Sequence, residues 1–197
     1  PRVVDAKALV DWNEHSPSMP INGESTRNAD DPLAERGEGL ARGDELLSEY
    51  ELLRARMRPR ELWPASVVAF AKRWEEWKAD HDLVVFGDMI ERAWRDCPVA
   101  PGNPTVGFFD EAQDCSRLEW ALIRSWARAM DYVVCVGDDD QTIYEWRGAN
   151  AEAFLNPPLP ESQTFVLAQS YRVPRAVHGL ATRWIEQVDG RHPKPYR

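Results

Sequence analysis

Two adjacent carboxylates, Asp110 and Glu111, directly follow a short apolar run at residues 105–109. The run has the length and composition of a buried strand, and ligands of α/β proteins gather where parallel strands end. Mg²⁺ prefers one or two hard carboxylates and keeps several waters, and a neighbouring glutamate can polarise an attacking water. The pattern therefore indicates a metal site for nucleotide hydrolysis. An acidic helix N-terminus, in which Asp110, Glu111 and Asp114 complement the helix dipole, explains the same residues equally well.

A second candidate segment, residues 137–149, reads GDDDQTIYEWRGA and follows another apolar run at residues 132–136. Its three consecutive aspartates are costly unless they are solvated, capped or facing cations. Tyr144, Trp146 and Arg147 offer aromatic faces and a cation, which single-stranded nucleic acid uses for stacking and phosphate contact. Taken alone, a solvated loop with both aromatic rings buried at the edge of the core is the simpler interpretation.

A third candidate segment, residues 167–174 (LAQSYRVP), places Tyr171 and Arg172 just before a helix that starts with a proline. A base could stack on Tyr171 while Arg172 reaches a phosphate. For these eight residues alone, a helix-entry segment with a surface arginine is the simpler interpretation.

The elements that must position these segments alternate between strand and helix. Buried strands are expected at 105–109, 132–136 and 164–167, with helices at 116–130 and 174–188. Strand, helix and strand at this spacing predict a parallel βαβ unit.

The first half of the chain has helical spacing instead. Helices are expected at 3–12, 46–57, 64–77 and 82–94, with a loop at 16–32 and a break at 98–104. Asp82 is expected to cap the last of these helices, with Phe86, Met89, Ile90 and Ala93 facing inward.

Tryptophans and arginines of this half allow two interpretations each. Trp74, Trp77 and Trp94 are expected in the core rather than on a DNA-stacking surface. The arginines at 54, 56, 58 and 60 form either a phosphate-contacting patch or a solvated helix end.

Composition indicates an ordinary globular chain of 197 residues, 43% apolar and 29% charged, with a formal net charge of −9. The acidic balance by itself argues against a nucleic-acid partner. The charge is uneven, however, because residues 24–51 are strongly acidic and residues 172–197 are basic. Three cysteines without a CxxC pair argue against a disulfide scaffold or zinc ribbon and favour a reducing cytosol. No apolar run is long enough to span a membrane.

In order and spacing, the three candidate segments resemble motifs II, III and IV of the UvrD/Rep (PcrA-like) family of superfamily 1 DNA helicases. The matching residues are DEAQD at 110–114, GDDDQTIYEWRGA at 137–149 and QSYRVP at 169–174. The resemblance extends over about residues 82–190. Glu145 stands where a glycine is frequent, and Ser170 stands where an asparagine is common.

The resemblance implies a role for each matching residue. Asp110 and Glu111 would hold Mg²⁺, and Glu111 would be the catalytic base for ATP hydrolysis. Gln141 would sense the γ-phosphate and link it to the DNA. Tyr171 would stack on adenine, and Arg172 would contact the γ-phosphate as an arginine finger. Tyr144, Trp146 and Arg147 would contact single-stranded DNA or DNA junctions.

The fold that the resemblance implies is α/β: the parallel-sheet portion of a P-loop NTPase (RecA-like) domain with a helical inserted subdomain. Residues 1–96 would form the helical subdomain, residues 97–168 the second part of the first RecA-like domain, and residues 169–197 the start of the second.

The phosphate loop GxxxxGK[ST] of this family is absent from the sequence. None of the four lysines (Lys7, Lys72, Lys78 and Lys194) follows a glycine or precedes Ser or Thr. The chain also begins at Pro1 rather than methionine. We therefore expect a cytoplasmic, internal fragment of an ATP-dependent DNA helicase, whose partners are the missing helicase domains. This fragment should be inactive alone, because the loop and its lysine anchor the β- and γ-phosphates.

Two alternatives remain open at this stage. The chain could be a hydrolysis-incompetent DNA-binding or regulatory module of a split or degenerate protein. It could also belong to a helicase–nuclease whose nuclease lies elsewhere.

Overall fold

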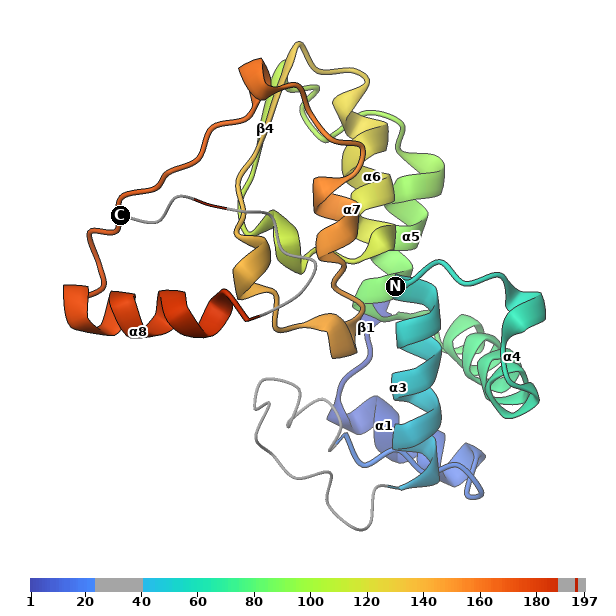
Figure 1. The fold of residues 1–197 in the computed structure, drawn as a ribbon. Coiled ribbons are helices and arrows are strands. Elements are labelled where there is room, and N and C mark those ends of the chain that lie inside the picture. The colour runs from blue at the N-terminus through green and yellow to red at the C-terminus, as the bar shows by residue number, and fades with distance from the viewer. Residues whose placement is uncertain (24–40, 188–193, 195–197) are drawn as a thin grey trace.

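Two small parallel sheets with helices around them form the computed structural model, which describes residues 1–23, 41–187 and 194 (Figure 1). One sheet pairs β1 (Arg2–Val3) with β2 (Leu83–Val84), and the other pairs β3 (Val106–Phe109) with β4 (Tyr132–Cys135). The predicted α/β class is confirmed. Most of the acidic segment and half of the predicted loop at 16–32 lie outside the described residues.

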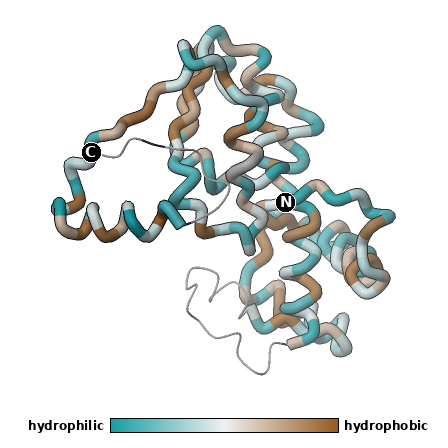
Figure 2. The backbone as a smooth tube through the Cα atoms, in the orientation of Figure 1, coloured by the Kyte–Doolittle hydropathy of each residue, from teal (hydrophilic) through white to brown (hydrophobic). Residues whose placement is uncertain are grey.

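Three helices of the first half enclose an aromatic core: α1 (Ala6–His15), α3 (Arg42–Ala55) and α4 (Ala65–Asp80). Trp12 lies at its centre, with ring centroids 4.9 Å from Trp74 in an edge-on contact and 5.5 Å from Trp77. The predicted core positions of Trp74 and Trp77 are confirmed, since both side chains are buried. The apolar stretches of these helices are visible along the backbone in Figure 2.

Helix α5 (Phe86–Asp96) begins later than predicted. Asp82 does not cap it, because the residues after Asp82 pair with β1 instead. The carboxylate of Asp88 accepts a hydrogen bond from the backbone N–H of Val85 at 3.0 Å and so closes the first turn. None of the residues of α5 is fully buried, and Ile90 and Ala93 are only half-buried. Phe86 and Met89, expected to face inward, are exposed, as is Trp94, expected in the core.

The predicted βαβ unit is confirmed: β3, α6 (Arg117–Ala127) and β4 follow one another, and the two strands are parallel. One face of this sheet packs on α6 and on α7 (Ala151–Leu155), through Phe109 and Cys135. The opposite face is open within the described residues, with Phe108 75% and Tyr132 71% exposed. The expectation of fully buried strands is therefore wrong for this face.

The predicted third strand at 164–167 does not form, because no other described strand pairs with its backbone. The helix predicted after it is present as α8 (Arg175–Ile185), which lies apart from the two cores in Figure 1. Short 3₁₀ helices complete the described chain: η1 (Arg60–Leu62), η2 (Ala112–Asp114), η3 (Asp139–Gln141), η4 (Glu145–Arg147) and η5 (Glu161–Gln163). None of the described helices has the length and apolar character needed to cross a membrane.

Candidate functional site

The ends of β3 and β4 bring the first two candidate segments side by side. The backbone N–H of Val136 donates to the carbonyl of Phe109 at 2.7 Å, and the N–H of Ala112 donates to the carbonyl of Val136 at 2.9 Å. Since parallel strands end at the same edge of a sheet, the loops after them share that edge. Asp110 and Glu111 therefore lie at the same edge of the sheet as η3.

Asp110 and Glu111 are both exposed at the end of β3. The N–H of Glu111 donates to Asp110 Oδ1 at 2.9 Å, and Glu111 has left-handed backbone angles, with φ 51° and ψ 38°. This conformation is costly for a residue with a side chain and is often found at functional sites. Two exposed carboxylates at a strand end are hard oxygen ligands, and they suit one Mg²⁺ that keeps part of its water shell.

The helix N-terminus explanation of these acidic residues is wrong. Residues 112–114 form the isolated turn η2, and α6 begins only at Arg117. Its start is completed by Ser116 and Glu119: the N–H of Glu119 donates to Ser116 Oγ, and the N–H of Ser116 donates to Glu119 Oε2 at 2.6 Å. Asp110 and Glu111 are thus outside that helix.

Gln113 connects the two segments, and sequence reasoning missed it. Its side chain is buried; Oε1 accepts a hydrogen bond from the backbone N–H of Asp138 at 3.0 Å, and Nε2 donates to Glu111 Oε2 at 2.8 Å. Gly137 makes this link possible, because a Cβ there would lie 2.6 Å from Gln113 Oε1. A glutamine among carboxylates and a glycine after the next strand were the available signals in the sequence.

Replacing Gln113 with leucine should lower the free energy of unfolding by about 1–3 kcal/mol, since the N–H of Asp138 loses its buried acceptor. Urea unfolding followed by circular dichroism measures the difference. Gln163→Leu in η5 is the matched control, because Gln163 is exposed and a surface change of this kind costs less than about 0.5 kcal/mol. Equal losses in the two variants would contradict the assigned link.

The three aspartates of the second segment face a cation. The ammonium group of Lys194 forms ion pairs with Asp138, Asp139 and Asp140, the last at 3.2 Å. Burial alone would lower the pKa of Lys194, but hydrogen bonds and the charges of Asp138 and Asp139 outweigh it and raise that pKa above its usual value. Of the three conditions expected for such a run, which were solvation, capping or a facing cation, the structure shows the facing cation.

Gln141 lies at the end of η3 and is exposed. Its Nε2 donates to Asp138 Oδ2 at 2.7 Å, on the carboxylate whose other oxygen pairs with Lys194. Asp138 in turn binds Gln113 through its backbone N–H. Glu111 and Gln141 are therefore joined by a continuous chain of hydrogen bonds through Gln113 and Asp138.

Tyr144, Trp146 and Arg147 lie on or beside η4. The rings of Tyr144 and Trp146 are 6.2 Å apart at 62°, and the guanidinium of Arg147 lies 5.6 Å from the Tyr144 ring centroid. Trp146 is 41% exposed and Tyr144 is half-buried, so the interpretation with both rings buried in the core is wrong for Trp146. An exposed indole next to a cation is available for base stacking.

Tyr171 and Arg172 are not brought to this site. Both lie in the bend before α8; Tyr171 is 94% exposed, and Arg172 is exposed as well. Within the described part of the chain, neither side chain bonds to Asp110, Glu111 or Gln141.

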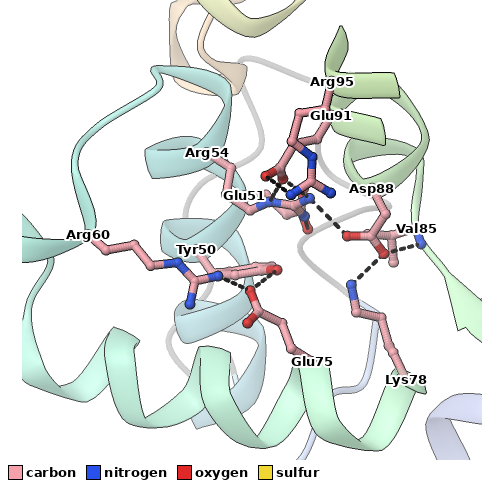
Figure 3. A network of polar contacts seen from close by, with 10 residues as sticks. All are labelled: Tyr50, Glu51, Arg54, Arg60, Glu75, Lys78, Val85, Asp88, Glu91 and Arg95. Atoms are coloured by element: carbon pink, nitrogen blue, oxygen red, sulfur yellow. Dashed lines mark hydrogen bonds and ion pairs between the residues drawn. The ribbon is translucent and has the colours of Figure 1, made fainter. Parts of the chain in front are cut away.

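Of the two interpretations of the arginines at 54, 56, 58 and 60, the phosphate-contacting patch is wrong, because Arg54 and Arg60 pair with carboxylates (Figure 3). Arg54 is only 8% exposed and pairs with Asp88 at 2.8 Å and Glu91 at 2.7 Å. Arg60 pairs with Glu75, which also accepts a hydrogen bond from the Tyr50 hydroxyl. The two remaining arginines, at 56 and 58, are exposed at the end of α3.

The region that contains this site is similar in sequence to known DNA helicases. Residues 105–158 match the family model described as the UvrD/REP helicase N-terminal domain. The chain is 42% identical over 119 residues to DNA helicase II of Salmonella typhimurium and of Escherichia coli, covering 55% of this chain and 16% of each relative. It is 34% identical over 87 residues to ATP-dependent DNA helicase PcrA of Staphylococcus epidermidis, covering 43% of this chain and 12% of that relative. The chain thus spans less than a fifth of the length of these relatives.

Proposed function

Because the chain carries a segment of the UvrD/Rep helicase family, we propose that it is part of an ATP-dependent DNA helicase that couples Mg-ATP hydrolysis to movement on single-stranded DNA. The observation that carries the proposal is the hydrogen-bonded chain from Glu111 through Gln113 and Asp138 to Gln141. It ties the carboxylates after β3 to the loop that leads into η4. A change at a bound nucleotide can therefore reach the aromatic residues next to η4.

The roles of the residues follow from their positions. Asp110 and Glu111 would hold Mg²⁺, which would supply positive charge to neutralise the phosphates. Glu111 orients and deprotonates the attacking water, since an exposed carboxylate at the strand end can reach it. Gln141 offers its amide to the γ-phosphate. Tyr171 and Arg172 complete the nucleotide site only after the segment before α8 moves towards it.

The DNA contact belongs to Tyr144, Trp146 and Arg147. Stacking on the indole and a phosphate contact from the guanidinium require no particular base, which suits a protein that moves along a strand. DNA junctions are bound by the same three residues, through the single-stranded part of the junction.

The open face of the β3–β4 sheet supports an incomplete RecA-like domain. Parallel sheets are covered on both faces, and here the face with Phe108 and Tyr132 is open within the described residues. We assign residues 1–96 to the helical subdomain, 97–168 to the second part of the first RecA-like domain, and 169–197 to the start of the second. Other helicase domains of a cytoplasmic parent protein then cover this face and supply the phosphate loop.

The missing phosphate-loop sequence also favours a second candidate, a DNA-binding or regulatory module without hydrolysis. Both candidates share the DNA contact and differ in whether the parent protein hydrolyses ATP. A parent protein that contains GxxxxGK[ST] before this segment decides for the helicase.

The purified chain should bind single-stranded DNA and should not hydrolyse ATP. Fluorescence anisotropy with a labelled oligothymidylate at 50 mM salt measures the first, and phosphate release from Mg-ATP measures the second. We expect a Kd of about 10⁻⁶–10⁻⁴ M, typical of non-specific contact. Absence of binding would contradict the assigned DNA contact. ATP turnover that Asp110→Asn abolishes would contradict the assigned need for a phosphate loop from outside this chain.

A further inference from the structure

Helix α3 ends against the segment that presents Trp146 and Arg147. The guanidinium of Arg56, the residue after α3, donates to the backbone carbonyl of Glu145 at 3.3 Å. At the other end of η4, Gly148 lies against Ala55, the last residue of α3. The two contacts join residues that are about ninety positions apart in the sequence.

We propose that Ala55 and Arg56 are positioning residues that hold residues 144–148 in the conformation that presents Trp146 and Arg147 to single-stranded DNA. The inference rests on the proposed function, because it concerns the same DNA-contacting segment. It assigns a role to the end of α3, which lies in the helical half of the chain and outside the three motif segments.

The contact between Gly148 and Ala55 sets how closely the two elements approach. Gly148 has a φ of +96°, which disfavours any residue with a side chain, and a Cβ at this position would lie 2.8 Å from Ala55 Cβ. Gly148 is buried, so the contact is closed to water. A larger side chain at position 55 must therefore displace η4.

The hydrogen bond from Arg56 holds the other side of the same turn. The carbonyl of Glu145 also accepts the N–H of Gly148 at 3.0 Å, which closes the turn. Arg56 thus contacts the same carbonyl, that of Glu145, whose hydrogen bond with Gly148 closes the turn. Within the turn, the N–H groups of Arg147 and Ala149 donate to the carbonyl of Tyr144 at 2.9 and 3.1 Å. The rate at which these N–H groups exchange with solvent therefore measures whether the turn is closed.

The end of α3 is itself held in place. Arg54 precedes Ala55 and pairs with Asp88 and Glu91 of α5 (Figure 3). The N–H of Met57 donates to the carbonyl of Arg54 at 2.8 Å and ends the helix there. A fixed support on one side and a short 3₁₀ turn on the other suit a positioning role.

Hydrogen–deuterium exchange of the DNA-free chain tests the inference directly. We expect Arg56→Ala to speed the exchange of the 147–149 amides about two- to tenfold, the effect of one lost hydrogen bond. Ala55→Leu should speed them at least as much, and Arg56→Lys, which keeps a donor, should restore part of the protection. Arg58→Ala is the matched control, because Arg58 is an exposed neighbour without a bond to η4 among the described residues. The strand amides of β4 should be unchanged in Arg56→Ala and show that the fold is intact.

DNA binding then gives a second readout. Arg56→Ala and Ala55→Leu should raise the Kd for the oligothymidylate several-fold, whereas Arg58→Ala should have a smaller effect at 200 mM salt, where phosphate contacts are weakened. Unchanged exchange at 147–149 in both Arg56→Ala and Ala55→Leu would overturn the inference while the proposed function stands. Faster exchange with unchanged Kd would also overturn it. Failure of the unmodified chain to bind DNA would overturn both.

Discussion

Arg54→Ala should lower the free energy of unfolding by about 3–5 kcal/mol, because it removes a buried cation that pairs with three carboxylates. Arg54 lies between α3 and α5, with Asp88 at 2.8 Å, Glu91 at 2.7 Å and Glu51 at 3.3 Å. Without the guanidinium, Asp88 keeps its ion pair with Lys78 at 2.5 Å and the hydrogen bond from the N–H of Val85. Glu51 and Glu91 are partly exposed and can regain water, so most of the cost falls on Asp88 and on the lost packing.

Urea unfolding monitored by circular dichroism measures this loss. Arg95→Ala is the matched control, since Arg95 approaches the same Glu91 at 3.9 Å but is exposed, and an exposed pair is worth less than about 1 kcal/mol. Arg54→Met keeps much of the apolar stem and separates packing from charge. If Arg54→Ala costs no more than Arg95→Ala, the cluster does not hold α3 and α5 together.

The same cluster predicts a dependence on pH. Burial alone would raise the pKa of Asp88, but hydrogen bonds from Lys78 and the backbone N–H of Val85 outweigh it, so this pKa is below its usual value. A carboxyl whose pKa is lower in the folded chain contributes stability above its unfolded pKa and loses it as the pH falls through the folded value. This contribution should therefore fade below about pH 4, near the unfolded pKa of aspartate.

The sequence was sufficient for the elements with clear periodicity. The apolar runs before Asp110 and Gly137, with a helix between them, predicted two parallel strands, and β3 and β4 confirm this. The rest depended on contacts distant in the sequence. The arginines at 54–60 have a spacing typical of a surface patch, but the carboxylates that bury Arg54 come mainly from a helix about 35 residues away.

Two other differences have the same origin. The start of α5 is set by pairing between β1 and β2, which no pattern around Asp82 reveals. The run at 164–167 has strand composition, but a strand needs a neighbour, and none of the described strands pairs with it. Likewise, the position of the Gln113 amide depends on its close contact with Gly137, which follows the next strand.

Trp146→Ala should weaken binding of single-stranded DNA by about 5- to 150-fold, which corresponds to the loss of one base–aromatic stack. Trp146 is 41% exposed, so its loss should change stability far less than loss of a buried tryptophan. Trp146→Phe, which keeps an aromatic face, should recover part of the affinity. Anisotropy titrations with the oligothymidylate at 50 mM salt measure all three proteins.

Trp94→Ala serves as the matched control, because Trp94 is a similarly exposed tryptophan on a different helix, α5. Arg147→Ala separates the charge from the ring: it should reduce the slope of log K against log salt by about 0.7, the value for one phosphate on a single strand. Trp146→Ala should leave that slope unchanged, since an indole releases no counterions. If both tryptophan variants weaken binding equally, the aromatic ring at η4 is not a stacking site. If the single substitution Trp146→Ala also reduces the salt slope, its effect on binding comes from displacing Arg147 rather than from a lost stack.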